Sequence, residues 1–104
     1  MPKPVSLSYG SAAILHAVAS GRQFGFDIME ATGLTSGTVY PALERLESAG
    51  LLRSTWEADA AAHADGRPAR RYFTLTASGA VALRGALEKY KALRPLAGFS
   101  PEEA

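Results

Sequence analysis

The stretch GLTSGTVYPALERLESAGLLRSTWE (Gly33–Glu57) decides the fold together with GRPARRYFTLT (Gly66–Thr76), which follows a short Ala-rich segment. Apolar residues recur at helical spacing in the first part, and apolar and polar residues alternate in the parts that follow. The expected order is therefore a helix, a strand, an arginine-bearing loop and a second strand. A recognition helix followed by a β-hairpin wing has this order, which builds a DNA-reading surface and has little catalytic use.

The first part predicts an amphipathic helix. Val39, Leu43 and Leu46 follow one another at i, i+4 and i+7, so they share one face. Thr35 is expected to cap the helix through its hydroxyl, because the first N–H groups of a helix have no partner inside it. Pro41 removes one helical N–H and is expected to kink the helix near its start.

The other side of this helix is polar, as expected for a helix that enters the major groove of DNA. A glycine in its first turn permits close approach of the backbone to the DNA. The residues expected to contact operator DNA from this helix are Ser36, Gly37, Thr38, Tyr40, Pro41 and Arg45.

Three arginines, Arg67, Arg70 and Arg71, follow the turn signal Asp65-Gly66 and suit contact with phosphates or a narrow minor groove. All three are counted as expected DNA-binding residues. Strand alternation places Arg70 and Arg71 on opposite faces, so they are not expected to act alike. Arg67, nearest the tip, is the first choice for DNA contact. Arg71 is the candidate for an internal ion pair instead.

The rest of the chain predicts helices over about 8–19, over 24 or 25 to 32, and from 77 to about 94, the last capped by Thr76. A winged-helix core leaves little for this last helix to cover in its own subunit. Its apolar residues Leu83, Leu87 and Tyr90 are therefore expected at a dimer interface, and the alternative is that the helix folds back on its own domain.

The fold class expected is mainly α with a small β-hairpin: a winged helix-turn-helix plus a C-terminal dimerisation helix. One structural domain accounts for the chain. Within it, residues 1–76 form the DNA-binding region, 77–94 the dimerisation helix and 95–104 a flexible tail. Trp56 is expected in the core or at the wing root, and the alternative is that it lines a ligand pocket at the dimer interface.

These residues resemble the PadR family of winged-helix transcriptional regulators. A GTxYPALxRLExxGL block (Gly37–Leu51) and a later RRYxxLTxxG block (Arg70–Gly79) carry the resemblance, which extends over roughly residues 7–90. It matches the small subgroup with a single C-terminal helix. It implies a homodimeric regulator, most often a repressor, bound to double-stranded operator DNA. It also allows control by a small-molecule effector, since several relatives bind small aromatic or cationic compounds between their subunits.

Composition agrees with an intracellular globular domain. The chain has 104 residues, 47% of them hydrophobic, and no cysteine, which excludes disulfides. Neither a signal peptide nor a run near the ~20 apolar residues of a membrane span is found in the sequence. We therefore expect a cytoplasmic protein, associated with the nucleoid when bound to DNA, and no membrane partner.

No enzyme is expected. A nucleophile–base pair, a metal cluster and a glycine-rich phosphate loop are missing from the sequence, and His16 and His63 lie at no metal-ligand spacing. No metal or cofactor is therefore assigned. The alternative function is a winged-helix module that binds protein and has lost DNA contact, toward which Glu44 and Glu47 on the reader helix point. The net charge of +1 supports DNA binding only weakly.

Overall fold

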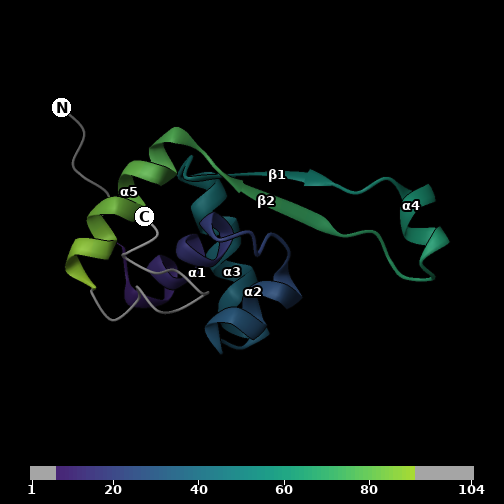
Figure 1. Ribbon diagram of the computed structural model, residues 1–104, viewed down its shortest axis with the longest axis horizontal. Coiled ribbons are helices and arrows are strands. Elements are labelled where there is room, and N and C mark those ends of the chain that lie inside the picture. Colours follow the sequence, from purple (N-terminus) through teal and green to yellow (C-terminus); the bar gives the residue numbers. More distant parts are fainter. Residues whose placement is uncertain (1–6, 91–104) are drawn as a thin grey trace.

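The computed structural model describes residues 7–90 and confirms the expected winged helix-turn-helix. The hairpin extends away from a body of helices and carries a short helix at its far end (Figure 1). The elements in chain order are α1 (Tyr9–Ala19), α2 (Gly25–Thr32), α3 (Ser36–Ser48), β1 (Leu52–Trp56), α4 (Asp59–Ala64), β2 (Arg71–Leu75) and α5 (Ala77–Lys89).

The two strands pair in antiparallel register, with Leu52 opposite Leu75 and Trp56 opposite Arg71. Because side chains alternate along a strand, the residues of these two pairs share the face of the hairpin that turns toward α3. The backbone N–H of Phe73 donates to the carbonyl of residue 23 at 2.7 Å, so the segment before α2 lies along the outer edge of β2. The wing is thus attached to both α2 and α3.

The core is built around α1, whose residues 12–18 are all buried. A helix that is buried all round belongs in the centre of a domain, and α1 contacts α2, α3, α5 and β2. The apolar stripe predicted for the reader helix is confirmed, since Val39, Leu43 and Leu46 are buried against this centre. Within residues 7–90 no helix has the length and apolar character needed to cross a membrane.

Two local predictions were wrong. Thr35 stands at the N-cap of α3 with extended backbone, but its hydroxyl caps no helical N–H and lies 3.4 Å from the hydroxyl of Thr38. The segment between the strands was expected to be a loop, yet it contains α4. Alanine-rich sequence has high helix propensity, and Asp59 in the first turn complements the helix dipole.

The cap predicted for the last helix is confirmed, because the Thr76 hydroxyl accepts from the N–H of Gly79 at 2.9 Å. The helix is described as far as Lys89. Its predicted end near residue 94 and the predicted tail over 95–104 lie outside the described residues.

The reasoning that α5 has little to cover in its own subunit was wrong. Leu83 is 7% exposed and belongs to the hydrophobic core, and Leu87 packs against that core. The Tyr90 hydroxyl donates to the carbonyl of Leu7 at 3.0 Å, and its ring meets Tyr9 edge to face. One face of α5 therefore closes the core of its own subunit.

Candidate nucleic-acid interface

The residues of α3 that were predicted to contact DNA are all exposed. They do not, however, share one edge of the helix. Tyr40 and Arg45 are five residues apart, which places them about 140° apart around an α-helix. Tyr40 lies on the edge that faces the wing, together with Glu44 and Glu47, which bond to a wing residue. Arg45 lies on the opposite edge of α3, two turns after Thr38.

Arg71 joins the wing to α3. Its guanidinium donates to Glu44 and to Glu47, and its Nε donates to the Ser54 hydroxyl at 3.0 Å. The Ser54 hydroxyl in turn donates to Glu47 at 2.6 Å. The bond from Ser54 and the charge of Arg71 lower the pKa of Glu47. The ion pair that was the alternative for Arg71 is therefore confirmed, and it fixes the wing relative to α3.

Arg67 is held by acidic neighbours. Its two terminal nitrogens lie 2.5 and 2.8 Å from the carboxylate of Glu57, and one of them lies 3.1 Å from Asp65. Hydrogen bonds from Arg67 lower the pKa of Glu57 from its usual 4.5 to about 2. A guanidinium that donates to both oxygens of a carboxylate has fewer N–H groups left to donate to a phosphate. The side chain chosen for DNA contact from sequence is thus engaged within the wing.

Arg70 differs from its two neighbours. Its guanidinium carbon lies 4.2 Å from the centroid of the Phe24 ring, a cation–π contact. None of the ion pairs between described residues includes it. The same holds for Arg45 and for Arg53, an exposed residue of β1 that the sequence reasoning did not consider. Strand alternation could have identified Arg53 as a cation on the opposite face from Ser54.

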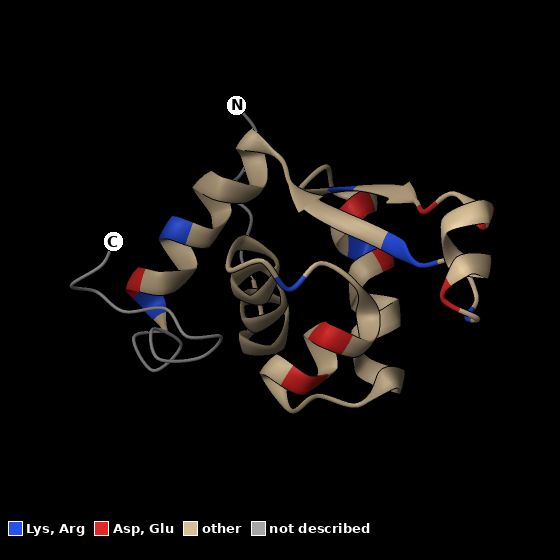
Figure 2. Cartoon of the chain, turned by 45° about the vertical axis from the view of Figure 1, so that its right-hand side comes forward, with Lys and Arg blue, Asp and Glu red and all other residues tan. Residues whose placement is uncertain are grey.

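Charges of both signs are interleaved along the wing and α3, rather than gathered into one basic edge (Figure 2). Along the sequence, Glu57, Asp59 and Asp65 precede the end of the turn and the three arginines follow it. Folding pairs these two groups, because an antiparallel hairpin brings Glu57 beside the residues that follow the turn. Among residues 7–90 no cluster of three or more His, Asp or Glu side chains could hold a metal ion.

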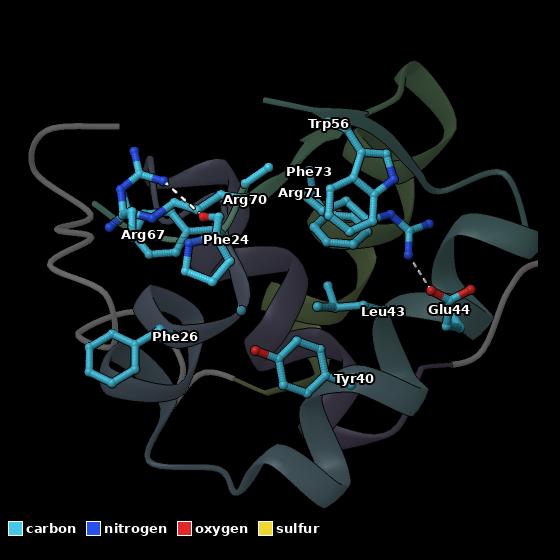
Figure 3. Close-up of a pocket in the computed structure, with 13 residues that line it drawn as sticks. Phe24, Phe26, Tyr40, Leu43, Glu44, Trp56, Arg67, Arg70, Arg71 and Phe73 are labelled. Carbon is cyan, nitrogen blue, oxygen red and sulfur yellow. Dashed lines mark hydrogen bonds and ion pairs between the residues drawn. The ribbon is translucent and has the colours of Figure 1, made fainter. Parts of the chain in front are cut away.

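A pocket of about 440 Å³ lies where α2, α3 and the wing meet. Figure 3 shows aromatic rings on several of its sides. Trp56 projects from the end of β1 and is 65% exposed, so its prediction as a core residue was wrong. The residue lies at the end of β1, on the rim of a pocket whose lining includes the core residues Leu43 and Phe73, rather than inside the core. The lining residues from α2 and α3 include Phe26, Tyr40 and Leu43, and those from the wing include Trp56, Arg70 and Phe73.

The comparisons with known proteins agree with this geometry. The model of the transcriptional regulator PadR-like family matches residues 14–85. No curated protein matches the chain. A PadR family transcription regulator from Clostridium difficile R20291 has a similar structure, with a TM-score of 0.68 and 22% identity over 84% of this chain and 92% of that chain.

Two further solved structures are similar. A PadR-like transcription factor from Bacteroides fragilis is 25% identical, with a TM-score of 0.65 and coverage of 81% of this chain and 82% of that chain. A Streptococcus mutans UA159 protein is 27% identical, with a TM-score of 0.66 and coverage of 90% and 87%. The family model spans more than half of the sequence. This chain therefore belongs to the PadR-like family of transcriptional regulators.

Proposed function

We propose that the chain is a homodimeric, sequence-specific DNA-binding regulator that acts as a repressor on double-stranded operator DNA in the cytoplasm. The observation that carries the proposal is the exposed polar surface of α3, oriented relative to the wing by the bonds of Arg71 to Glu44 and Glu47. A reader helix held at a fixed angle to a wing can address two adjacent grooves of one duplex. Membership of a family of transcriptional regulators supports the same role.

The decisive experiment is selection of bound genomic fragments, followed by a salt titration with the selected operator. We expect affinity to fall steeply with salt, because phosphate neutralisation releases counterions. Arg45→Ala should lose discrimination between operator and random DNA, since a bidentate base contact is worth about 1–3 kcal/mol. Arg84→Ala removes a likewise exposed cation from α5 and is the matched control once light scattering shows that it dimerises like the parent. Salt-insensitive capture of a protein, with no DNA selected, would favour the alternative interaction module.

Dimerisation is the second part of the proposal. The expected interface consisted of Leu83, Leu87 and Tyr90, but Leu83 is buried in the core of its own subunit. Val81, on the outer side of α5, is 61% exposed and offers an apolar residue for a second subunit. Val81→Asp should therefore give folded monomers with weak operator binding, since one winged helix makes few contacts. Light scattering after size exclusion measures this, and a parent that is monomeric at high micromolar concentration contradicts it.

Relief of repression by a small molecule is the third part, and it rests on the family alone. We expect some small aromatic or cationic compounds to release the operator from the full chain. Fluorescence anisotropy of a labelled operator measures release directly. A compound that releases the operator should raise the protein concentration at which half of the operator is bound. This effect should saturate with the compound, and the melting temperature of the protein should not fall. A panel without any such compound removes this part and leaves the DNA-binding proposal intact.

A further inference from the structure

Three of the large apolar side chains that the described chain exposes gather around the pocket between α3 and the wing. Trp56 is 65% exposed, Phe26 63% and Tyr40 50%. Buried Leu43 and Phe73 line the pocket between them, as the close-up in Figure 3 shows. Exposed apolar patches of this kind mark surfaces that bind another molecule. We call this aromatic pocket, with its lining residues from α2, α3 and the wing, the groove.

The charge of the groove indicates an anionic occupant. Arg67 and Arg71 both line it, and both are offset by carboxylates. Arg70 rests on the ring of Phe24 and forms none of the ion pairs between described residues, although its charge contributes to the lowered pKa of Glu57. Stacking uses the face of a guanidinium and leaves its N–H groups at the edge free to donate. Of the three arginines that line the groove, Arg70 is therefore the one whose guanidinium is not bonded to a carboxylate.

The position of the groove identifies which anion it meets. If α3 enters the major groove and the wing reaches the adjacent minor groove, the DNA strand that separates these two grooves must cross between α3 and the wing. The groove of the protein lies where this DNA strand would cross. A DNA strand presents alternating deoxyribose rings and phosphates. Aromatic faces can pack on the sugar, while a guanidinium and a phenolic hydroxyl can donate to phosphate oxygens.

We propose that this groove of the protein binds the sugar–phosphate backbone of the operator strand that runs between the major and the minor groove of the DNA. Arg70 and the hydroxyl of Tyr40 donate to one phosphate, and the ring of Trp56 packs on the neighbouring deoxyribose. This inference rests on the proposed DNA-binding function and adds a contact that carries no base information. Trp56 and Arg70 thus set the register of the protein on the duplex, and α3 reads the bases.

Trp56 is the only tryptophan of the chain, so its emission reports on this groove alone. Titration of the full chain with operator duplex should change the emission saturably, with the midpoint that anisotropy of the labelled operator gives. Trp56→Ala and Arg70→Ala should each weaken operator and random duplex several-fold and equally. Arg70→Ala should also lower the salt slope by about 1, whereas Trp56→Ala should leave the slope unchanged. Arg84→Ala, an exposed cation of α5, should leave both quantities near those of the parent.

Neutralising single phosphates identifies the partner of Arg70. Operators that carry one methylphosphonate each should weaken binding at several positions in the parent. One of these positions, on the strand between the two grooves, should cause no further loss in Arg70→Ala, because the contact is already missing. Thermal melting checks that each variant is folded. Tyr40→Phe, which keeps the ring and removes the hydroxyl, should show partial loss at the same phosphate.

Two outcomes overturn the inference while leaving DNA binding intact. One is a saturated operator complex in which Trp56 emission equals that of the free protein. The other is an Arg70→Ala variant whose salt slope equals that of the parent, while sodium benzoate quenches Trp56 and releases the operator. The second result makes the groove a site for a free aromatic anion. A parent that binds no duplex in a salt-dependent manner overturns the proposed function itself, and this inference with it.

Discussion

The ring of Tyr40 occupies the space that a side chain at Gly25 would need: a Cβ built on Gly25 lies 2.5 Å from the ring. Gly25 is the first residue of α2, and Tyr40 belongs to α3. The two helices of the helix-turn-helix therefore approach each other closely at this point. Tyr40 is oriented by that contact, although half of its surface is exposed.

Gly25→Ala should lower the stability of the fold and weaken operator binding. The added methyl group must displace the outer end of the Tyr40 ring or separate α2 from α3; because a half-exposed side chain can shift, the cost should stay below the ~1–3 kcal/mol of overpacking against rigid neighbours. Thermal melting and operator anisotropy measure the two effects. Gly10→Ala is the matched control, because Gly10 lies in the first turn of α1 and its Cβ would meet only one side-chain atom, at 4.0 Å.

A double-mutant cycle makes this prediction specific. In a Tyr40→Ala background the space beside Gly25 is empty, so Gly25→Ala should cost little further stability. The coupling between the two substitutions is then comparable to the cost of Gly25→Ala in the parent. Additive effects would mean that the ring yields freely and that Gly25 does not orient it.

Arg71→Ala should lower the melting temperature by a few degrees and leave the salt slope of DNA binding unchanged. Its guanidinium is bonded to Glu44, Glu47 and Ser54, so its loss removes internal bonds rather than a phosphate contact. Arg53→Ala provides the control for the melting temperature, since Arg53 is an exposed cation of the hairpin that forms none of the ion pairs between described residues. A normal melting temperature with a lower slope would place Arg71 on the DNA.

The pair of Glu57 and Arg67 should make the stability of the wing depend on pH in the acid range. The pKa of Glu57 falls from its usual 4.5 to about 2 in the folded chain because Arg67 donates to its carboxylate. As the pH falls, Glu57 is therefore protonated in the unfolded chain before it is protonated in the folded chain. The contribution of this pair is fully present above pH 4.5 and is lost as the pH falls from about 4.5 to about 2.

Acid titrations of the parent and of Glu57→Gln measure this contribution. The variant should be less stable than the parent at neutral pH, and the difference should shrink as the pH falls through that range. Glu88→Gln, an exposed residue of α5 outside the ion pairs between described residues, should follow the parent throughout. A constant difference between parent and Glu57→Gln down to pH 2 contradicts the assignment.

The elements that the sequence predicts correctly are those with a local signal. The period of Val39, Leu43 and Leu46 locates α3, and the alternation around Phe73 locates β2, because burial on one face imposes a period on the chain. The short helix α4 escaped prediction, since its alanines and polar residues carry no apolar period. Its one buried residue, Ala62, is 1% exposed.

The chemistry of the candidate site was less predictable than the fold. Arg71 bonds to Glu44, which is 27 positions away along the chain. A pairing over that separation leaves no local sequence pattern. Trp56 was assigned to the core from the general tendency of tryptophan, but its place at the end of β1 leaves it beyond the core. Which arginines remain free for DNA depends on such pairings. The predicted DNA-binding residues stay predictions for the experiments above.

Gly79, in the first turn of α5, lies close to the backbone of the residue that precedes β1. A Cβ built on Gly79 would lie 2.1 Å from the carbonyl oxygen of Leu51, and that oxygen is held in place by a bond from the N–H of Thr76 at 3.1 Å. Backbone cannot yield as a flexible side chain does. Gly79→Ala should therefore lower the free energy of unfolding by about 1–3 kcal/mol, as overpacking does elsewhere.

Gly85→Ala tests the same substitution in the same helix where there is room, because a Cβ on Gly85 meets no atom within 4 Å. It should raise the free energy of unfolding by about 0.5–1 kcal/mol, since alanine restricts the unfolded chain and favours the helix. Urea unfolding of both variants and the parent gives the two differences. If Gly79→Ala proves as stable as Gly85→Ala, α5 does not approach Leu51 closely, and the junction that orients the wing on the core is looser than this geometry requires.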